Sequence, residues 1–391
     1  MGQLRLGVIG ATCKENERRL PIHPRHFDRI DADVRADIYL EAGYGKYFGV
    51  ADTQLSGWVA GIRSREQLIA ECDVILLLKP HARDLAELRD GQALWGWPHC
   101  VQDEELTQRA IDGRHTLIAF ESMNLWSRNG SFKLHVFHKN NEIAGYCSVL
   151  HAMSIVGWSG TYGRRLRAVV IGFGATARGA VTALNAQGVH DINVLTNRSV
   201  TEVASPIHPA RIVHFAQDPN SLDGSTEPFV STQGGRAPLA GFLARHDIIV
   251  NCVLQDTNAP LLFLGDADLA ALRPNSLIID VSCDETMGFS WARPTSFARP
   301  TFSVGANVTY YAVDHSPSYL WDSATWEISE ALLPYLRTVV AGPERWHADQ
   351  TVRRAIEILD GTVLNPNILS FQNRRTEYPH ARRARGGRQS A

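Results

Sequence analysis

Four residues that are able to transfer protons each follow an apolar run typical of a buried strand: Lys79, His99, Glu121 and Asp284. Ligands of open α/β sheets bind at the carboxyl ends of the strands. We therefore expect these four side chains to converge on one cleft. Each by itself is an ordinary loop residue, but four at equivalent strand ends favour a site for acid–base chemistry.

The lysine and the histidine are the strongest candidates for proton transfer. Leu78 and Pro80 flank Lys79, so its side chain would be partly removed from water, which favours the neutral amine. His99 titrates near neutral pH without help. Arg19 lies in a charged loop after the first predicted strand, where a guanidinium would suit a substrate carboxylate. A solvated surface arginine is the equal alternative.

A glycine-rich stretch predicts a dinucleotide site. Residues 167–178 read Arg-Ala-Val-Val-Ile-Gly-Phe-Gly-Ala-Thr-Ala-Arg, with Gly172, Gly174 and Ala177 at the three small positions. A helical pattern and a strand at 191–195 follow, which completes the βαβ fingerprint. The glycines allow a pyrophosphate to approach the helix N-terminus. A bare turn of this kind is a weak signal, but its context favours a nucleotide.

The end of the second strand bears on which dinucleotide is bound. NAD-selective sites carry an acidic residue there, which accepts a hydrogen bond from the ribose 2′-hydroxyl. Residues 194–199 contain no acid, and Arg198 suits a 2′-phosphate. This favours NADP(H) and leaves NAD(H) open, because an exposed loop arginine fits the same pattern.

The chain alternates between strand and helix patterns, which predicts an α/β fold with parallel sheets. We expect four parts: a substrate domain (1–145), a nucleotide domain (146–318), C-terminal helices that pack on the first domain (319–373) and a disordered tail (374–391). Three local patterns also carry predictions: a helix near Leu85–Leu88, a surface excursion at Ser205–Gly235 and a helix at Thr351–Leu359.

Composition narrows the function classes. The 391 residues are 44% hydrophobic and 20% charged with a net charge of −2, so neither nucleic acid nor an anionic membrane is an expected partner. The six cysteines form no C-x-x-C pair, so no metal site and no disulfide framework are expected. No signal-peptide pattern or membrane-length apolar run is present, which favours the cytoplasm. The sequence leaves a homo-oligomer open.

The motifs, in their order, resemble the alanine dehydrogenase superfamily, which includes saccharopine dehydrogenase (lysine-forming) and N5-(carboxyethyl)ornithine synthase. The resemblance extends from Gly7 to about Leu336. Its anchors are Lys-Glu-Asn-Glu-Arg-Arg-Leu-Pro-Ile-His-Pro (14–24), Leu-Leu-Lys-Pro (77–80), Gly-Trp-Pro-His (96–99), Asn-Glu-Ile-Ala-Gly (141–145), Val-Ile-Gly-Phe-Gly (170–174), Ile-Ile-Asp-Val-Ser-Cys-Asp (278–284) and Val-Asp-His-Ser-Pro-Ser (313–318). The family implies two Rossmann-like domains, the first for substrate and the second for a nicotinamide nucleotide.

The resemblance also implies roles for individual residues. Lys79 and His99 become the acid/base pair with Glu121 as a tuning neighbour, Arg19 holds the substrate carboxylate, and Asp284 lies near the nicotinamide. The substrate positions implied beside Arg19 and Lys79 are Asn141 and His315. The nucleotide positions are Gly172, Gly174, Ala175, Thr176, Ala177, Thr196, Asn197, Arg198, Val253, Leu254, Val281 and Asp284.

Departures from the family pattern bear on the substrate. The Asp314-His315-x-Pro-Ser pattern is closer to saccharopine dehydrogenase, whereas Asn141 replaces the serine of alanine dehydrogenases. We therefore expect an NAD(P)H-dependent enzyme that condenses an amino acid amine with a 2-oxo acid and reduces the product. The alternatives are a deaminase of the alanine dehydrogenase type and a non-catalytic nucleotide-binding regulatory module. A transhydrogenase subunit would need a membrane partner.

Overall fold

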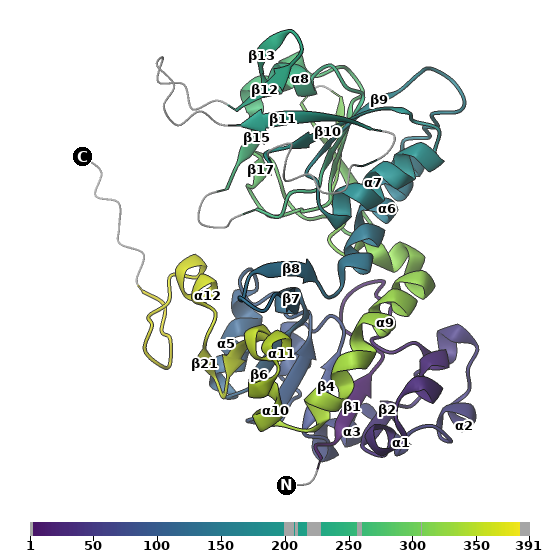
Figure 1. Cartoon of the computed structure of the whole chain (residues 1–391), viewed down its shortest axis with the longest axis vertical. Coiled ribbons are helices and arrows are strands. Elements are labelled where there is room, and N and C mark those ends of the chain that lie inside the picture. The colour runs from purple at the N-terminus through teal and green to yellow at the C-terminus, as the bar shows by residue number, and fades with distance from the viewer. Residues whose placement is uncertain are drawn as a thin grey trace. The chain divides into compact units, whose positions relative to one another are not determined.

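The computed structural model describes residues 3–198, 207, 210–216, 228–255, 260–305 and 307–383. The chain forms two compact units, Met1–Phe137 with Trp321–Ala391, and His138–Leu320 (Figure 1). The boundary that we expected after residue 145 falls inside the continuous helix α6 (His138–Ile155), which belongs wholly to the second unit. In the described ranges, no helix combines the length and the apolar character needed to cross a bilayer.

The first unit is built on an eight-stranded sheet. In sheet order its strands are β21 (Thr362–Val363), β20 (Ile356–Leu359), β6 (Thr116–Ala119), β5 (Ala93–Gly96), β4 (Val74–Leu77), β1 (Leu6–Ile9), β2 (Ile38–Glu41) and β3 (Gly61–Arg63). The strands from β6 to β3 are parallel, whereas β20 and β21 are antiparallel. Parallel strands are covered on both faces, which explains their unbroken apolar runs.

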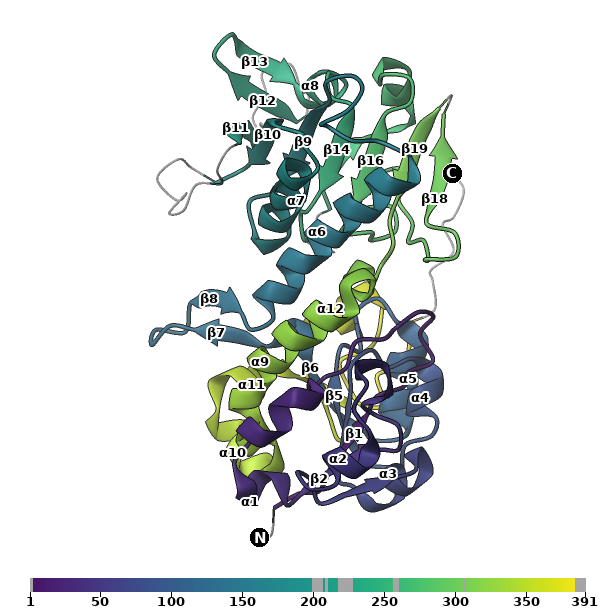
Figure 2. The same ribbon diagram turned by 90° about the vertical axis from the view of Figure 1, so that its right-hand side faces the viewer.

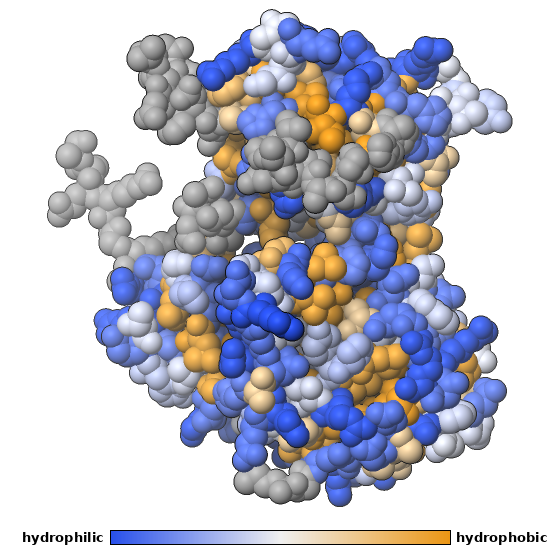
Figure 3. Space-filling model, in the orientation of Figure 1, coloured by the Kyte–Doolittle hydropathy of each residue, from blue (hydrophilic) through white to orange (hydrophobic). Residues whose placement is uncertain are grey.

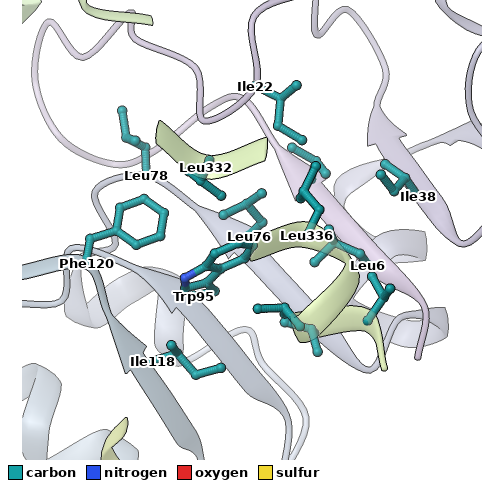
Figure 4. Packing of buried hydrophobic residues seen from close by; sticks show 14 of the residues in the cluster. Leu6, Ile22, Ile38, Leu76, Leu78, Trp95, Ile118, Phe120, Leu332 and Leu336 are labelled. Atoms are coloured by element: carbon teal, nitrogen blue, oxygen red, sulfur yellow. The ribbon is translucent and has the colours of Figure 1, made fainter. Parts of the chain in front are cut away.

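Helices cover this sheet and close its core. They are α1 (Ala32–Arg35), α2 (Asp52–Leu55), α3 (Arg65–Glu71), α4 (Ala82–Leu85), α5 (Glu104–Asp112), α9 (Trp321–Val340), α10 (Pro343–Ala348), α11 (Gln350–Ala355) and α12 (Pro366–Phe371). The helix α9 places Leu332 and Leu336 against Leu6, Leu76 and Trp95 of the sheet (Figure 4). Their i, i+4 spacing puts both leucines on one helix face. The C-terminal helices therefore belong to the core of the first unit.

The second unit contains a nine-stranded sheet. Its order is β13 (Gly235–Pro238), β12 (Phe229–Thr232), β11 (Arg211–Ala216), β10 (Asp191–Thr196), β9 (Arg167–Ile171), β14 (Ile248–Asn251), β16 (Leu277–Asp280), β19 (Val308–Tyr311) and β18 (Thr301–Val304). The six strands from β11 to β19 are parallel. Both units thus have the expected α/β architecture with mostly parallel sheets, and the predicted fold class is confirmed.

Two helices pack closely on one face of this second sheet. The helix α6 lies beside α7 (Ala175–Ala186), and both share an apolar core with β9 and β14 (Figure 2). A Cβ atom on Gly145 would lie 2.0 Å from the Thr176 carbonyl oxygen, and one on Gly179 would lie 1.7 Å from that of Glu142. Glycine at both positions therefore allows the two helix backbones to touch. The short helix α8 (Leu239–Leu243) contributes to the core on the opposite face.

The remaining described strands form two-stranded sheets, β7 (Asn124–Trp126) with β8 (Phe132–His135) and β15 (Leu262–Leu264) with β17 (Gly288–Phe289). Hydrophilic side chains cover most of the face shown in Figure 3, with smaller apolar patches among them. That distribution agrees with the large buried cores of the two units.

Several local predictions were wrong. The helix expected at Leu85–Leu88 is α4, which ends at Leu85. The helix expected to run to Leu359 ends at Ala355, and the chain continues as β20 because residues 356–358 pair with β6. Within the expected excursion Ser205–Gly235, β11 and β12 are sheet strands, and residues 199–206, 208–209 and 217–227 lie outside the described part.

The prediction of a disordered tail from residue 374 was also wrong as far as residue 383. Arg374 is buried, donates from Nε to Gln372 Oε1 at 2.6 Å, and bridges to Arg382 along the backbone. Its guanidinium also donates to Gln108 Oε1 at 2.7 Å, which anchors the segment on α5. Residues 384–391 lie outside the described residues.

Candidate active site and nucleotide site

Lys79 and His99 lie side by side in the first unit. Lys79 Nζ is 3.1 Å from His99 Nε2, within hydrogen-bond distance. Lys79 is partly buried, whereas the His99 side chain is 42% exposed. A cation that donates to an imidazole nitrogen forms a pair in which a proton can pass from one group to the other.

The neighbouring strands β4 and β5 bring these two residues together. Trp97 N donates to Leu78 O at 2.9 Å, so the parallel pairing continues beyond the last strand residues. A Cβ atom on Gly96 would lie only 1.9 Å from the Leu77 carbonyl oxygen. Glycine at position 96 therefore permits the close approach of the two strand ends, a signal that the sequence carried and that we did not use.

Glu121 holds the backbone of His99. The third strand in the row, β6, is followed by a 3-10 turn over Phe120–Ser122, from which Glu121 Oε1 accepts the His99 backbone N–H at 2.7 Å. His99 has a φ of +48°, a left-handed conformation that a non-glycine residue seldom adopts. The carboxyl group therefore stabilises the strained turn that orients the imidazole.

The same carboxyl group is electrostatically unusual. Burial raises the pKa of Glu121 well above its ordinary value, and the nearby carboxyl group of Glu357 raises it further. Hydrogen bonds from backbone amides, including that of His99, and the charge of Lys79 oppose this shift. In the described part of the chain, Glu121 Oε2 has no hydrogen-bond partner. The sequence analysis did not identify Glu357 as part of the site.

Arg19 lies near the same strand ends, but it is not a solvated loop residue. Its side chain is 3% exposed, and Nε donates to Glu17 Oε1 at 2.8 Å. The guanidinium carbon is 5.8 Å from the ring centre of Trp97, two residues before His99. The structure therefore brings Arg19 to the end of β5, with Glu17 as an ion-pair partner that we did not predict.

The predicted glycine turn in the second unit fits a dinucleotide. Gly172 has a φ of +116°, and a Cβ atom there would meet the Cys252 carbonyl oxygen at 3.0 Å. Gly174 precedes the first turn of α7, and a Cβ atom there would meet nothing within 4 Å. The turn thus requires glycine at 172 for its conformation, while Gly174 leaves open space before a helix N-terminus, where a pyrophosphate fits.

The other predicted nucleotide positions follow the ends of neighbouring parallel strands. Ile171 pairs in register with Leu195 and Asn251, and Asn251 pairs with Asp280. The last residue of β10, Thr196, and the residues that follow these strands therefore share one edge of the sheet: Gly172, Ala175, Thr176, Ala177, Asn197, Arg198, Val253, Leu254 and Val281. Asn197, Arg198 and Leu254 are exposed, whereas Thr196 and Ala177 are buried.

A buried aspartate fixes the turn that precedes Asp284. Asp280 accepts hydrogen bonds from the Tyr310 hydroxyl at 2.5 Å, from Asn251 Nδ2 at 2.9 Å and from the Cys283 backbone N–H at 3.1 Å. Cys283 also has a φ of +48°. Burial raises the pKa of Asp280 to about 6, against the opposing hydrogen bonds from Tyr310, Cys283 and Asn251. Sequence reasoning named Asp284 but not this supporting network.

The two remaining substrate candidates belong to the second unit. Asn141 is a half-buried residue of α6, and His315 is buried, with Nδ1 2.6 Å from Asp314 Oδ1. The following residue, Ser316, donates to the Ala144 carbonyl oxygen of α6 at 3.1 Å. The segment that carries His315 therefore packs on the helix that carries Asn141, whereas Arg19 and Lys79 belong to the first unit.

Comparison with known proteins gives two family matches that cover most of the chain. Residues 9–144 match the family described as "Alanine dehydrogenase/PNT, N-terminal domain", and residues 143–366 match "Alanine dehydrogenase/PNT, C-terminal domain". The predicted superfamily is therefore confirmed. This is a family of nicotinamide nucleotide enzymes, which agrees with the open glycine turn of the second unit.

Individual relatives are distant but extend over nearly the whole chain. The chain is 25% identical to N(5)-(carboxyethyl)ornithine synthase of Clostridium botulinum over 81% of its own length and 89% of that protein. It is 24% identical to alanine dehydrogenase of Mycobacterium tuberculosis over 94% of its length and 96% of that protein.

Among solved structures, an L-alanine dehydrogenase superposes with a TM-score of 0.72 at 19% identity, covering 94% of this chain and 99% of the other. The transhydrogenase from Sinorhizobium meliloti gives a TM-score of 0.66 at 17% identity, with 92% and 99% covered. These two likenesses establish the fold.

Proposed function

Because the chain belongs to the alanine dehydrogenase/PNT family, we propose that it is an NAD(P)H-dependent oxidoreductase acting on the C–N bond of an amino acid. The proposed reaction joins an amino acid amine to a 2-oxo acid and reduces the product to a secondary amine. The observation that carries the proposal is the 3.1 Å contact between Lys79 Nζ and His99 Nε2 at adjacent strand ends. The similarity to the carboxyethylornithine synthase supports this substrate class.

The first unit supplies the proton transfers in this proposal. Attack of the amine on the 2-oxo carbon requires loss of a proton from nitrogen, and loss of water from the adduct requires a proton on the departing oxygen. Lys79 and His99 accept the first proton and deliver the second. Arg19 positions a substrate carboxylate, which fixes the geometry of attack. Glu121 keeps the imidazole oriented through the His99 backbone.

The second unit supplies the nucleotide site. Gly172, Gly174 and the N-terminus of α7 would hold the pyrophosphate, and the segments at Val253 and Val281 would line the nucleotide. When bound, the reduced nicotinamide supplies the hydride that completes the reduction. Asp284 would orient it from the turn that Asp280 fixes.

We propose NADP(H) as the preferred nucleotide because Arg198 is exposed after β10 and no acid precedes it there. Steady-state kinetics with NADPH and NADH test this. Replacing Arg198 with alanine should raise KM for NADPH about tenfold, a loss of about 1.4 kcal/mol, and leave that for NADH nearly unchanged. Equal KM values for the two nucleotides in the unaltered protein would exclude the preference.

A co-substrate screen tests the reaction. Pyruvate and NADPH are supplied with ammonium or with each of a panel of amino acids, and nucleotide absorbance is followed. We expect oxidation only with an amino acid amine and a secondary-amine product in the mass spectrum. Oxidation with ammonium alone would instead favour an alanine-dehydrogenase-type deaminase, the second candidate, which the similarity to the mycobacterial enzyme supports.

A non-catalytic nucleotide-binding module is the alternative of another class. The proximity of Lys79 and His99 argues against it, because a module needs no proton-transfer pair. Replacing Lys79 with methionine and His99 with glutamine decides the question. If the variant still binds nucleotide and still restores the phenotype of cells that lack the protein, the catalytic proposal fails.

A further inference from the structure

A buried carboxyl group from near the end of the chain, that of Glu357, acts on Glu121, the residue that holds the His99 backbone. Glu357 is on β20, which pairs antiparallel with β6 just before Glu121. Its side chain is nearly inaccessible, and the residue is 3% exposed. Glu357 Oε1 accepts hydrogen bonds from Ser122 Oγ at 2.7 Å and Asn365 Nδ2 at 3.0 Å. In the described residues, Glu357 Oε2 has no hydrogen-bond partner, and the same holds for Glu121 Oε2.

We propose that Glu121 and Glu357 together hold one proton, carried by Glu121, and that Glu357 is thereby a positioning residue for the Lys79–His99 pair. Two ionised carboxylates at this place would repel each other, and in the described residues each would leave one buried oxygen without a hydrogen bond. One proton removes the repulsion and converts an unpartnered oxygen into a donor. The role in catalysis rests on the proposed function.

The hydrogen bonds decide which residue carries the proton. Ser122 Oγ and Asn365 Nδ2 both donate to Glu357 Oε1, and these side-chain hydrogen bonds stabilise the charged form of Glu357 and oppose the rise in its pKa that burial causes. Glu121 accepts a hydrogen bond from the His99 backbone N–H, whereas Glu357 accepts two from side chains. The proton therefore belongs on Glu121.

The surrounding charges define what this proton does. The titratable groups around the two carboxyls include Lys79, His99 and Cys100. Burial raises the pKa of Cys100 well above its ordinary value, so its thiol stays neutral. A neutral Glu121 places no full negative charge beside the imidazole. His99 and Lys79 can then release protons in a lower pH range than they would next to a carboxylate.

The C-terminal segment also fixes the loop that follows His99. Gln372 Nε2 donates to the carbonyl oxygens of Cys100 at 2.6 Å and Val101 at 3.2 Å. Gln372 Oε1 in turn accepts from Arg374 Nε at 2.6 Å. Residues 356–374 therefore supply a carboxyl group and two anchors to the region behind the acid–base pair, which places the C-terminal segment within the site.

Infrared titration of the carboxyl C=O stretch tests the proton directly and needs no substrate. We expect the difference spectrum between the unaltered protein and Glu121→Gln to show one protonated carboxyl at neutral pH. In Glu357→Gln its titration midpoint should fall by about one pH unit, a tenfold loss of proton affinity. Asp360→Asn is the matched control, because Asp360 is an exposed carboxylate on the same hairpin with a φ of +48° that asparagine tolerates.

The kinetic arm measures the pH profile of kcat/KM. Glu357→Gln should move the limb assigned to Lys79 and His99 to higher pH, since Glu121 ionises more readily and stabilises their protonated forms. Adding Glu357→Gln to Glu121→Gln should produce no further shift. A purely structural role would lower activity and leave the profile in place.

The outcomes separate the two proposals. Absence of the protonated carboxyl in the unaltered protein overturns the inference even if Glu357→Gln fails to fold. An unchanged midpoint in a folded Glu357→Gln also overturns it. So does a Glu357→Gln shift of the kcat/KM pH profile that is equally large in the unaltered protein and in Glu121→Gln. If the infrared midpoint shifts as expected but the protein oxidises NAD(P)H with none of the co-substrates, the two results separate. The shared proton is then supported, and the proposed function is rejected.

Discussion

His99 in the first unit and Cys283 in the second have the same local backbone conformation and different surroundings. Each is the third residue after a parallel strand, each has a φ of +48°, and each donates its backbone N–H to a carboxyl group, which is half-buried in the first unit and fully buried in the second. The carboxyl in the second unit is Asp280, whose oxygens are satisfied by Tyr310 and Asn251. The carboxyl in the first unit, Glu121, has one oxygen for which the described residues offer no hydrogen-bond partner, and it interacts electrostatically with Glu357.

The different hydrogen bonding of the two carboxyl groups indicates a different role for each turn. A positive φ at a non-glycine residue costs on the order of 1 kcal/mol, so the carboxyl group that holds it has a structural task in both units. A fully hydrogen-bonded carboxyl such as Asp280 makes the turn rigid. One with an unpartnered oxygen beside a second carboxyl keeps a proton that can respond to its neighbours. We therefore expect changes at Glu121 to alter the pH dependence of catalysis, and changes at Asp280 to alter the stability of the second unit.

The largest expected effect comes from the acid–base pair itself. Lys79→Met or His99→Gln should lower kcat/KM about 100- to 10,000-fold, because each removes a proton-transfer group from the 3.1 Å pair. Nucleotide affinity, measured by fluorescence titration, should stay within about twofold, since the glycine turn belongs to the other unit. If either variant also loses nucleotide affinity, the first unit contributes to nucleotide binding as well as to proton transfer.

The next effect concerns the rigid turn. Asp280→Ala should lower the free energy of unfolding by about 3 kcal/mol, because it leaves the Tyr310 hydroxyl and the Asn251 amide buried without an acceptor. Tyr310→Phe removes only one of the donors and should cost about 1 kcal/mol. Urea denaturation followed by circular dichroism measures both. If Tyr310→Phe lowers the free energy of unfolding more than Asp280→Ala does, Asp280 does not organise the turn.

The same aspartate predicts a pH dependence of stability. Burial raises the pKa of Asp280 from 3.8 to about 6 in the folded protein. Because the folded pKa lies above the unfolded one, the native state binds the proton more tightly. The contribution is fully present below the unfolded pKa and is lost as pH rises through about 6, with a total of about 2 to 3 kcal/mol.

Asp280→Asn should flatten this part of the stability curve, as measured by unfolding at a series of pH values. Glu121→Gln serves as the comparison in the other unit, since burial raises the pKa of Glu121 in the same direction. If Asp280→Asn leaves the slope unchanged and Glu121→Gln removes it, the titrating carboxyl lies in the first unit alone. Asp280 would then not titrate in the folded protein, and it would differ from Glu121 more than we infer.

Much of the fold and the first layer of the site could be predicted because they depend on local patterns. The apolar runs at 74–77, 93–96 and 116–119 are typical of parallel strands buried on both faces, and the strand-end rule then places Lys79 beside His99. The helix α5 (Glu104–Asp112) also begins with a local signal, because Asp103 accepts the Leu106 backbone N–H at its start. The glycine turn likewise carries its own signal.

The layer behind these residues could not be predicted because it depends on contacts between distant parts of the chain. Residues 351–359 read as one helix, and only pairing with β6 makes their second half a strand that carries Glu357. The arginine-rich end reads as disordered, but Arg374 is held by hydrogen bonds to Gln372, to Gln108 of α5 and to the His380 carbonyl oxygen. Neither pairing leaves a mark in the local sequence.

The smallest effect separates binding from folding within the second unit. A Cβ atom on Gly174 would meet nothing within 4 Å, so Gly174→Ala should leave the melting temperature nearly unchanged. The added methyl group would instead enter the space that we assign to the pyrophosphate and should weaken nucleotide binding about tenfold, or about 1.4 kcal/mol. Calorimetric titration with NADPH and NADH measures this loss.

Gly172→Ala is the matched control, because it places the same methyl group two residues earlier, where φ is +116° and the Cys252 carbonyl oxygen is 3.0 Å from the new carbon. That change should lower stability as well as affinity. A loss of affinity at position 174 without a loss of stability is what a binding surface produces. If both variants instead lose only stability, the glycines serve the packing of α7 and the nucleotide binds elsewhere.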